Sequence, residues 1–226
     1  MTELSIVCPM FNEEAGIARS VAALVAVMPK LGVSAELVLV DDGSTDRTRV
    51  VAEQALGGLG EIVSYASNRG RGHALRAGFA RSRGRYVIAT EADLSWGTDV
   101  IAALLKPLLE QRADVTIASP YAPGGRMEGV PCSRAWLSRS GNALLGRKFG
   151  VTMATGMTRG YSRSALDSLH LTADDKDLHV QILSEARRNA LRVIEVPAVL
   201  RWAADRSGRR SLRWRHITSH LGWAFR

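Results

Sequence analysis

Strand-like and helix-like segments alternate through about the first hundred residues, and this alternation limits the folds open to the chain. Four apolar runs read as strands: Leu4–Cys8, Glu36–Val40, Ile62–Tyr65 and Tyr86–Ala89. Segments with helical spacing of apolar residues lie between them. Crossovers between parallel strands are right-handed and place a helix on a face of the sheet. The pattern therefore predicts an α/β fold with a mostly parallel central sheet that helices cover on both faces.

Local signals set the expected ends of these elements. Pro9 is expected to end the first strand, because proline cannot donate to a central ladder. The first helix is expected to run from Asn12 or Glu13 to about Leu31, with acids in its first turn, where the helix dipole favours them. The second helix is expected to be capped by Ser44 or Asp46, and the third to span Ala74–Ser82.

The second half of the chain is less regular. The expected elements are a helix over Asp99–Leu109, a strand over Val115–Ala118, a loop over Tyr121–Gly129, helices over Arg134–Lys148 and Leu178–Asn189, and a strand over Val193–Val196. Nothing resembles a linker, an internal repeat or a low-complexity stretch. Residues 1–226 are therefore expected to form one domain, with a basic segment rich in tryptophan and arginine from about residue 201 to 226.

Composition and charge restrict the partners. The 226 residues are 46% hydrophobic and 23% charged, so the chain can bury an ordinary core. The formal net charge of +8 favours nucleic acid, anionic lipid or phosphorylated small molecules. No apolar run is long enough to cross a bilayer, and the N-terminus has no basic stretch followed by an apolar signal core. The two cysteines lack metal-ligand spacing. A soluble or peripheral protein in a reducing compartment is expected.

Polar segments follow all four of the early strands, at residues 9–14, 41–46, 68–73 and 91–95. In a parallel sheet the carboxyl ends of the strands share one edge, and ligands bind there. The sequence therefore predicts that four polar segments converge on one binding site.

Glu91 and Asp93 follow the fourth strand with one residue between them. In an extended chain their side chains point to the same side, with Cα atoms roughly 7 Å apart. Two such carboxylates can hold a hard cation, which in turn can bind a diphosphate. The alternative is a solvated loop or a helix N-cap, and the shared sheet edge favours the cation site.

Two other segments of that edge have two readings each. Asp41 and Asp42 could accept hydrogen bonds from a base or a ribose hydroxyl, or they could form an Asx-type turn. Gly70 and Gly72, with Arg71, could let backbone N–H groups approach a phosphate, or they could form a plain glycine turn. Hydrolase chemistry is disfavoured, because the chain has no Gly-x-Ser-x-Gly elbow.

The order of these motifs resembles family 2 glycosyltransferases of the GT-A fold. The segments that carry the resemblance are Ser5–Glu14, Leu37–Thr48, Asn68–Ala74 and Glu91–Ser95. A further set resembles the branch that makes polyprenyl-phosphate sugars, of the dolichyl-phosphate mannose synthase type: Ala118–Tyr121 with Gly124–Gly125, Ser138–Asn142, Ile194–Pro197 and Arg206–Gly208. The resemblance covers nearly the whole chain.

This resemblance implies an inverting transfer of a sugar from a GDP- or UDP-linked donor to a polyprenyl phosphate. The implied nucleotide-binding residues are Pro9, Phe11, Glu13, Asp41, Asp42 and Arg71. Glu91 and Asp93 would hold Mg²⁺ or Mn²⁺ against the diphosphate, and Asp93, Arg139 and Arg206 are the implied catalytic residues. The implied acceptor residues are Ser138, Asn142, His179 and Gln181. A lipid phosphate is already an anion, so this acceptor needs no general base.

Three positions depart from the family pattern. Glu91 replaces the usual aspartate, Met153 stands where a later motif has an acid, and His179 and Gln181 stand where the family has Gln and Glu. His179 could act as a base for a hydroxyl acceptor or could be a packed polar residue, and packing is favoured. These changes indicate a diverged branch with a changed sugar or acceptor. The alternative is loss of activity, and the intact nucleotide-side motifs argue against it.

Three functions compete. The leading one is a metal-dependent glycosyltransferase acting on polyprenyl phosphate, cytoplasmic and peripheral on the inner face of the membrane. There a stripe of Trp214, Ile217, Leu221 and Ala224 could lie on an anionic membrane surface, or it could pack on its own domain. The second is a soluble glycosyltransferase with a small-molecule acceptor. The third is a nucleic-acid-binding module, which the absence of any recognition motif argues against.

Overall fold

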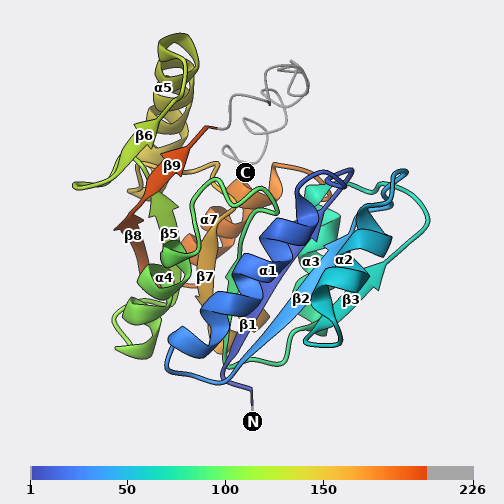
Figure 1. Cartoon of the computed structure of the whole chain (residues 1–226). Helices are drawn as coiled ribbons and strands as arrows, with labels where there is room; N and C mark the ends of the chain where they lie inside the picture. The colour runs from blue at the N-terminus through green and yellow to red at the C-terminus, as the bar shows by residue number, and fades with distance from the viewer. Residues whose placement is uncertain (1, 203–226) are drawn as a thin grey trace.

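A seven-stranded sheet forms the centre of the molecule, with the strand order β3-β2-β1-β4-β7-β5-β8 (Figure 1). The structure is a computed structural model that describes residues 2–202. The strands of this sheet are β1 (Leu4–Met10), β2 (Ala35–Asp41), β3 (Glu61–Ser64), β4 (Tyr86–Ala89), β5 (Val115–Ser119), β7 (Arg159–Ser162) and β8 (Val193–Pro197). Only the pairings of β7 with β4 and β5 are antiparallel. The prediction of a mostly parallel α/β sheet is confirmed.

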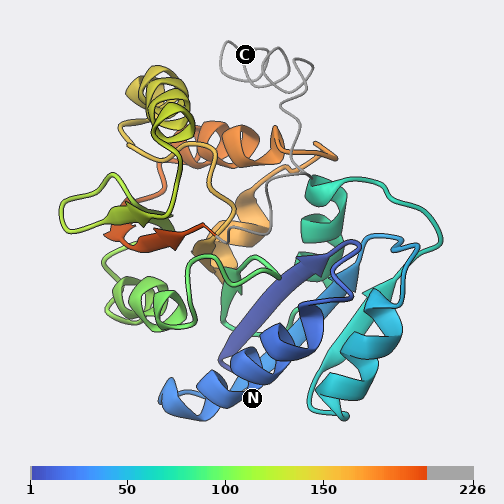
Figure 2. The ribbon, with the colours of Figure 1, turned by 45° about the horizontal axis from the view of Figure 1, so that its top comes forward.

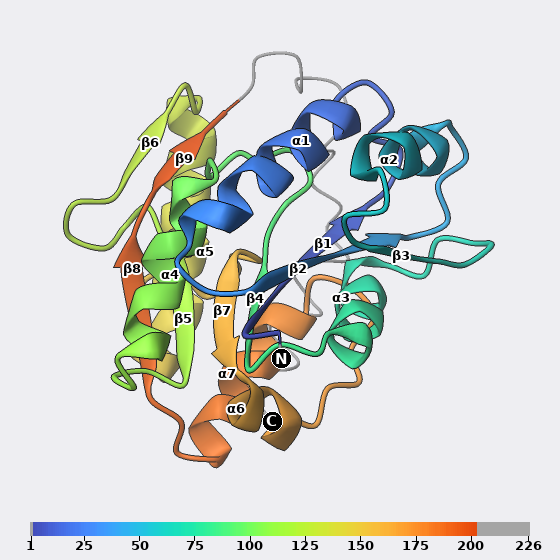
Figure 3. The ribbon, with the colours of Figure 1, turned by 60° about the horizontal axis from the view of Figure 1, so that its bottom comes forward.

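Helices cover both faces of this sheet. They are α1 (Ile17–Val27), α2 (Thr48–Leu56), α3 (Arg71–Arg81), α4 (Asp99–Leu109), α5 (Cys132–Phe149), α6 (Arg163–Ser168) and α7 (Leu178–Arg188), with a short 3₁₀ helix over Met28–Lys30. Figure 3 shows α1 and α2 on one side of β1–β3 and α3 on the other. Among the described residues, no helix combines the length and the apolar character needed to cross a membrane.

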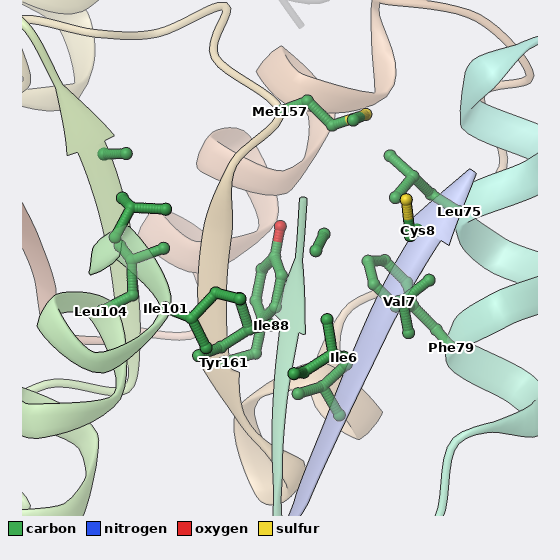
Figure 4. Packing of buried hydrophobic residues seen from close by; sticks show 14 of the residues in the cluster. Ile6, Val7, Cys8, Leu75, Phe79, Ile88, Ile101, Leu104, Met157 and Tyr161 are labelled. Atoms are coloured by element: carbon green, nitrogen blue, oxygen red, sulfur yellow. The ribbon is translucent and has the colours of Figure 1, made fainter. Parts of the chain in front are cut away.

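Buried side chains form a core on both faces of the central strands. Val7 of β1 points toward α3, which contributes Phe79, whereas Ile6 and Ile88 point to the opposite face, toward α4 (Figure 4). The Phe79 ring meets the Tyr161 ring edge to face, with centroids 5.4 Å apart. The apolar runs of the first four strands are therefore buried as their patterns predict, and they fix the positions of the strand ends.

The first strand does not stop at Pro9, contrary to the sequence prediction. β1 pairs with β2 as far as Met10, but its pairing with β4 ends at Val7. At Pro9 the strand has a partner on one side only, so proline is tolerated within it.

The first helix begins at Ile17 and not at Asn12 or Glu13, so its first turn contains no acid. Asn12 has a left-handed φ of 53°. The N–H of Glu13 donates to Thr48 Oγ1 at 2.7 Å. Tertiary hydrogen bonds to the start of α2 therefore hold residues 12–14 out of the helix.

Other boundaries also differ. Helix α3 begins at Arg71, three residues before the predicted start, and the predicted 121–129 loop contains strand β6 (Arg126–Glu128). Strand β6 pairs with β9 (Val199–Arg201) in a separate two-stranded sheet, which lies beside α5 in Figure 2. The sequence prediction also missed β7, α6 and β9, all of which are short.

Candidate active site

The four polar segments that follow the early strands converge, as predicted. The N–H of Thr45 donates to Asn12 Oδ1 at 2.8 Å, which joins the ends of β1 and β2. Asp42 bonds the 68–70 segment, and Arg71 Nη1 lies 3.9 Å from Glu91 Oε1. The chain order reverses between β1 and β4, and in such sheets this switch point is where ligands bind. The carboxyl ends of β1 and β4 therefore define the candidate site.

The end of β1 presents an aromatic ring at this point. Phe11 is exposed, whereas Pro9 and Glu13 are partly buried. Burial, together with the smaller effect of the charges of Glu13 and Glu91, raises the pKa of the Cys8 thiol on β1 to about 12. The carboxylates of Glu13 and Glu91 thus act together on the end of β1.

The two aspartates that follow β2 have different environments. Asp42 is buried, and its carboxylate accepts hydrogen bonds from Tyr65 Oη, Asn68 Nδ2 and the backbone N–H groups of Arg69 and Gly70. Asp41 is also buried and accepts one bond, from the N–H of Ser44, in the turn that the sequence offered as an alternative reading. Asp42 therefore fixes the 65–70 segment, which leaves Asp41 as the less engaged carboxylate of the pair.

The glycines Gly70 and Gly72 serve packing more than phosphate binding. A Cβ at Gly70 would lie 2.4 Å from the carbonyl oxygen of Asp174, and one at Gly72 would lie 2.7 Å from that of Ala173. The N–H of Gly70 donates to Asp42, and that of His73 donates to the Asp174 carbonyl. Most of the amides a phosphate cradle would use are already engaged, so the plain turn is the better reading. Arg71 is the group of this segment that reaches the site.

A single serine holds the two carboxylates that follow β4. Ser95 Oγ donates to Glu91 Oε2 at 3.0 Å, and the N–H of Ser95 donates to Asp93 Oδ1 at 2.8 Å. The carbonyl of Ser95 accepts a bond of 2.7 Å from the N–H of Arg201 in β9. The predicted extended alternation is not what joins them: the N–H of Leu94 donates to the carbonyl of Glu91, so residues 91–94 form a turn, and both carboxylates bond Ser95.

These two carboxylates suit a divalent cation that also binds a substrate. Within residues 2–202 no group of three or more His, Cys, Asp or Glu side chains is placed to hold a metal. Mg²⁺ is commonly bound by one or two carboxylates together with substrate phosphates and water. Glu91 and Asp93, beside the partly exposed Arg71, fit a site of this kind, in which substrate phosphates and water complete the coordination.

The residues predicted to bind the acceptor lie beyond β5, on α5 and α7. Tyr121 Oη donates to Ser138 Oγ at 2.8 Å, and the guanidinium of the exposed Arg139 lies 6.0 Å from the Tyr121 ring centroid. Asn142 is buried, and its Oδ1 accepts the N–H groups of Ala154 and Thr155. Ser138 and Arg139 are brought to one surface, whereas Asn142 ties α5 to the 154–155 loop.

His179 and Gln181 are both buried in α7. Gln181 Oε1 accepts the N–H groups of Thr172 and Ala173, and its Nε2 donates to the carbonyl of His170. The carbonyl of His179 accepts a bond of 2.8 Å from the buried guanidinium of Arg159. These contacts support the reading of His179 as a packed residue. Arg206 lies outside the described residues, as does the predicted stripe from Trp214 to Ala224.

Sequence reasoning missed Ser95 and Arg201. The Asp-x-Ser spacing of Asp93 and Ser95 is a usable signal, because aspartate often accepts the N–H two residues ahead of it. The bond from Arg201 has no local signal, since it joins segments far apart in the chain.

A cavity of about 510 Å³ lies at the opposite end of the sheet, by the amino ends of β4, β5 and β8. Arg85, Asp114, Arg163 and Arg192 are among its lining residues. Ligands of parallel sheets bind at the carboxyl ends, so this cavity is separate from the candidate site.

Solved structures place the fold in a known class. Glucosyl-3-phosphoglycerate synthase from Mycobacterium tuberculosis, in complex with Mn²⁺, UDP and phosphoglyceric acid, superposes with a TM-score of 0.71 at 21% identity. The match covers 99% of this chain and 78% of that one. The chain therefore has the GT-A fold, as the sequence resemblance implied.

The sequence comparisons identify the family. The model of glycosyl transferase family 2 matches residues 5–169, and the chain belongs to this family. It is 33% identical over 189 residues to the undecaprenyl-phosphate 4-deoxy-4-formamido-L-arabinose transferase of Pseudomonas aeruginosa, covering 80% of this chain and 53% of the relative. It is 29% identical to the low-salt glycan biosynthesis hexosyltransferase Agl6 of Haloferax volcanii, covering 95% of this chain and 52% of that one. The chain thus spans about half the length of these relatives.

Proposed function

We propose that the chain is an inverting, metal-dependent glycosyltransferase that moves a sugar from a nucleotide diphosphate sugar to a polyprenyl phosphate. The observation that carries this proposal is the carboxylate pair Glu91 and Asp93, directed by Ser95 to the switch point of a GT-A sheet. Two relatives support the acceptor class by name: the Pseudomonas undecaprenyl-phosphate transferase and the dodecaprenyl-phosphate galacturonate synthase of Rhizobium johnstonii, 33% identical over 67% of this chain and 44% of that one.

The nucleotide half of the site comes from β1 and β2. The exposed ring of Phe11 is available to stack on a base, with Pro9 and Glu13 beside it. Asp41 would accept a hydrogen bond from the base or the ribose, because among the described residues only the N–H of Ser44 donates to its carboxylate. Asp42 acts indirectly by fixing the 65–70 segment, and that segment carries Arg71 toward the diphosphate.

Glu91 and Asp93 are the residues that would hold Mg²⁺ or Mn²⁺. Bound there, the ion would neutralise charge that develops on the departing nucleotide diphosphate. Glutamate is one methylene longer than the usual aspartate, and the bond from Ser95 Oγ holds its carboxylate near Asp93.

The acceptor attacks on the side opposite the nucleotide. A phosphate oxygen of the polyprenyl phosphate forms a bond to the anomeric carbon as the bond to the diphosphate oxygen breaks, and the configuration inverts. No proton has to be removed, because the acceptor oxygen is already anionic. Arg139 and Ser138 would bind the acceptor phosphate, and Arg206 is assigned the same role from its motif.

This acceptor places the enzyme at a membrane as a peripheral protein. The inner, cytoplasmic face is proposed, because nucleotide sugars are made in the cytoplasm and both the net charge of +8 and the acceptor favour an anionic surface.

A thermal-shift titration tests the nucleotide and metal part of the proposal. UDP, GDP and their sugar conjugates are added with and without Mn²⁺, and a nucleotide should raise the unfolding temperature more when Mn²⁺ is present. Glu91→Ala should remove the metal-dependent part of the shift. Asp99→Ala, which removes an exposed acid nearby, is the matched control. If no nucleotide stabilises the protein, the proposal fails.

A transfer assay tests the acceptor. Radiolabelled nucleotide sugar is incubated with undecaprenyl phosphate or with 3-phosphoglycerate, and the product is sought in the organic or the aqueous phase. Label in the organic phase supports a lipid acceptor. Transfer only to 3-phosphoglycerate would contradict the polyprenyl phosphate acceptor and would support a small-molecule acceptor.

A further inference from the structure

Helix α5 carries an exposed apolar surface that its own domain does not cover. Trp136 is 71% exposed, Leu144 is 65% exposed and Leu137 is 45% exposed. The fully buried residues of this 18-residue helix are Asn142, Leu145 and Gly146. At 100° per residue, the three apolar side chains lie on the opposite face from those buried residues. They make up an outward-facing apolar stripe.

The charged residues of α5 all have one sign. Helix α5 contains Arg134, Arg139, Arg147 and Lys148 and no acidic residue. Arg134 lies over the Trp202 ring at 5.1 Å, and Arg147 is exposed. A helix with exposed Trp and Leu between basic side chains has the composition of helices that lie in a membrane interface.

We propose that the α5 stripe, Trp136, Leu137 and Leu144, docks on an anionic phospholipid bilayer, with the basic residues of α5 binding the headgroups. The positive charge of α5 favours an anionic bilayer over the other partners that could cover this surface. A second copy of the chain would bring four like charges against four, and the basic segment after Arg201 would be repelled in the same way. Nucleic acid would satisfy the charge but would leave two leucines without an apolar partner.

The position of α5 gives this docking a consequence for the site. Figure 1 shows α5 at the edge of the molecule, beyond β6 and β9. Its Ser138 and Arg139 contact Tyr121, which follows the carboxyl end of β5. Docking through α5 therefore brings the acceptor side of the site to the lipid surface. The inference goes beyond the proposed function, and it can be measured without transferase activity.

Co-sedimentation of the full chain with vesicles tests the proposal. Vesicles of phosphatidylcholine alone are compared with vesicles that also contain phosphatidylglycerol. The double change Trp136→Ser and Leu144→Ser should weaken binding to the anionic vesicles about tenfold. Leu59→Ser with Leu109→Ser, which removes two exposed leucines elsewhere, is the matched control and should bind as the wild type does. Equal binding by the Trp136 and Leu144 variant would overturn the proposal.

A second pair of variants tests the charges. Arg147→Gln with Lys148→Gln should weaken binding about tenfold or more, because each basic residue near an anionic surface contributes. Arg19→Gln with Lys30→Gln changes the net charge equally on exposed positions away from α5 and should have a much smaller effect. Equal losses in the two pairs would show that net charge alone drives binding and would overturn the proposal.

Brominated lipids give a direct readout of insertion. They should quench tryptophan fluorescence in the wild type, and the quenching should fall in Trp136→Phe. Quenching that is unchanged in Trp136→Phe, or a loss of DNA binding in the α5 variants with no change in vesicle binding, would contradict docking on lipid.

Discussion

The backbone N–H of Arg201 donates a 2.7 Å hydrogen bond to the carbonyl of Ser95. The same serine holds Glu91 through its hydroxyl and Asp93 through its N–H. One residue thus joins both carboxylates of the candidate metal site to the last described strand of the chain. The geometry of the carboxylate pair depends on Ser95 as much as on the acids themselves.

Ser95→Ala should weaken metal binding without unfolding the protein. The change removes the bond to Glu91 Oε2 and keeps the backbone bonds to Asp93 and Arg201. Loss of a group that orients a metal ligand commonly lowers metal affinity about 10- to 100-fold. The measurement is the Mn²⁺ concentration that half-saturates the nucleotide-dependent thermal shift. Ser95→Thr keeps the hydroxyl and should restore most of the affinity. An unchanged Mn²⁺ dependence in Ser95→Ala would show that this bond does not position Glu91.

Gly72→Ala should destabilise the fold by about 1–3 kcal/mol, because the new Cβ would lie 2.7 Å from the carbonyl oxygens of Ala173 and Asp175. Gly141 also lies in a helix, and a Cβ there would meet no atom within 4 Å. Gly141→Ala should therefore be neutral or should stabilise by about 0.5 kcal/mol. Urea unfolding of the two variants measures both effects. Equal stabilities would mean that the 173–175 segment does not pack on α3 as described.

Asp42→Asn and Asp41→Asn should differ in their effect on stability. Asp42 accepts four hydrogen bonds, two of them from backbone N–H groups, so loss of its charge should cost about 2 kcal/mol. Asp41 accepts one bond, so its change should cost less and should mainly weaken nucleotide binding. Chemical unfolding and nucleotide titration of both variants separate the two roles. If Asp41→Asn were the more destabilising change, Asp41 and not Asp42 would be the structural carboxylate.

The two cysteines should react very differently with a thiol reagent. Cys132 is exposed at the start of α5, whereas Cys8 is buried and its pKa is raised to about 12 by burial and by the charges of Glu13 and Glu91. Near pH 8, one thiol should react in the native protein and two in denaturant. Cys132→Ser should leave no fast-reacting thiol. A second fast thiol in the native protein would mean that the end of β1 opens readily.

Acid should remove a contribution that Asp114 makes to stability. The hydrogen bond from Arg192 lowers the pKa of the Asp114 carboxyl from its ordinary value of 3.8. A folded-state pKa below the unfolded one contributes stability above pH 3.8, and this is lost as the pH falls through the folded value. Asp114→Asn should therefore lose less stability than the wild type between pH 4 and about 2. The free energy of unfolding is measured by urea unfolding at each pH. If it falls equally with pH in the two proteins, Asp114 makes no such contribution.

The sequence predicts best what is set by local periodicity. The four early strands and α4 were predicted within one or two residues, because buried runs such as Tyr86–Ala89 carry their own signal. The start of α1 differs from the prediction, because the N–H groups of residues 13 and 14 donate hydrogen bonds to the side chains of Thr48 and Asp46, which holds them outside the helix. Strand β9 has only three residues, and β7, with the sequence Arg-Gly-Tyr-Ser, lacks the apolar run that marks β4.

In the candidate site, too, the sequence predicts what local patterns set and misses what contacts between distant segments set. The expectation that Glu91, Asp93 and the Asp41–Asp42 pair share one edge follows from the parallel direction of the strands, which the alternation of strands and helices indicates. The separate duties of Asp41 and Asp42, and the packing of Gly70 and Gly72 against residues 173–175, depend on contacts between distant segments. A motif states which residues are present, but it cannot state which of them are already engaged by the fold.

Strand β7 has a consequence for the order in which the molecule can assemble. It lies between β4 and β5, and it runs against both of them. Strands β1 to β4 can pair with one another as soon as they are made, through contacts that are close in the chain. Strands β5 and β8 can join that sheet only after β7 has inserted, so the acceptor half depends on late, long-range pairing, which is the slower kind. A fragment that ends near residue 150 should therefore form the nucleotide half and leave one edge of β4 open to other chains.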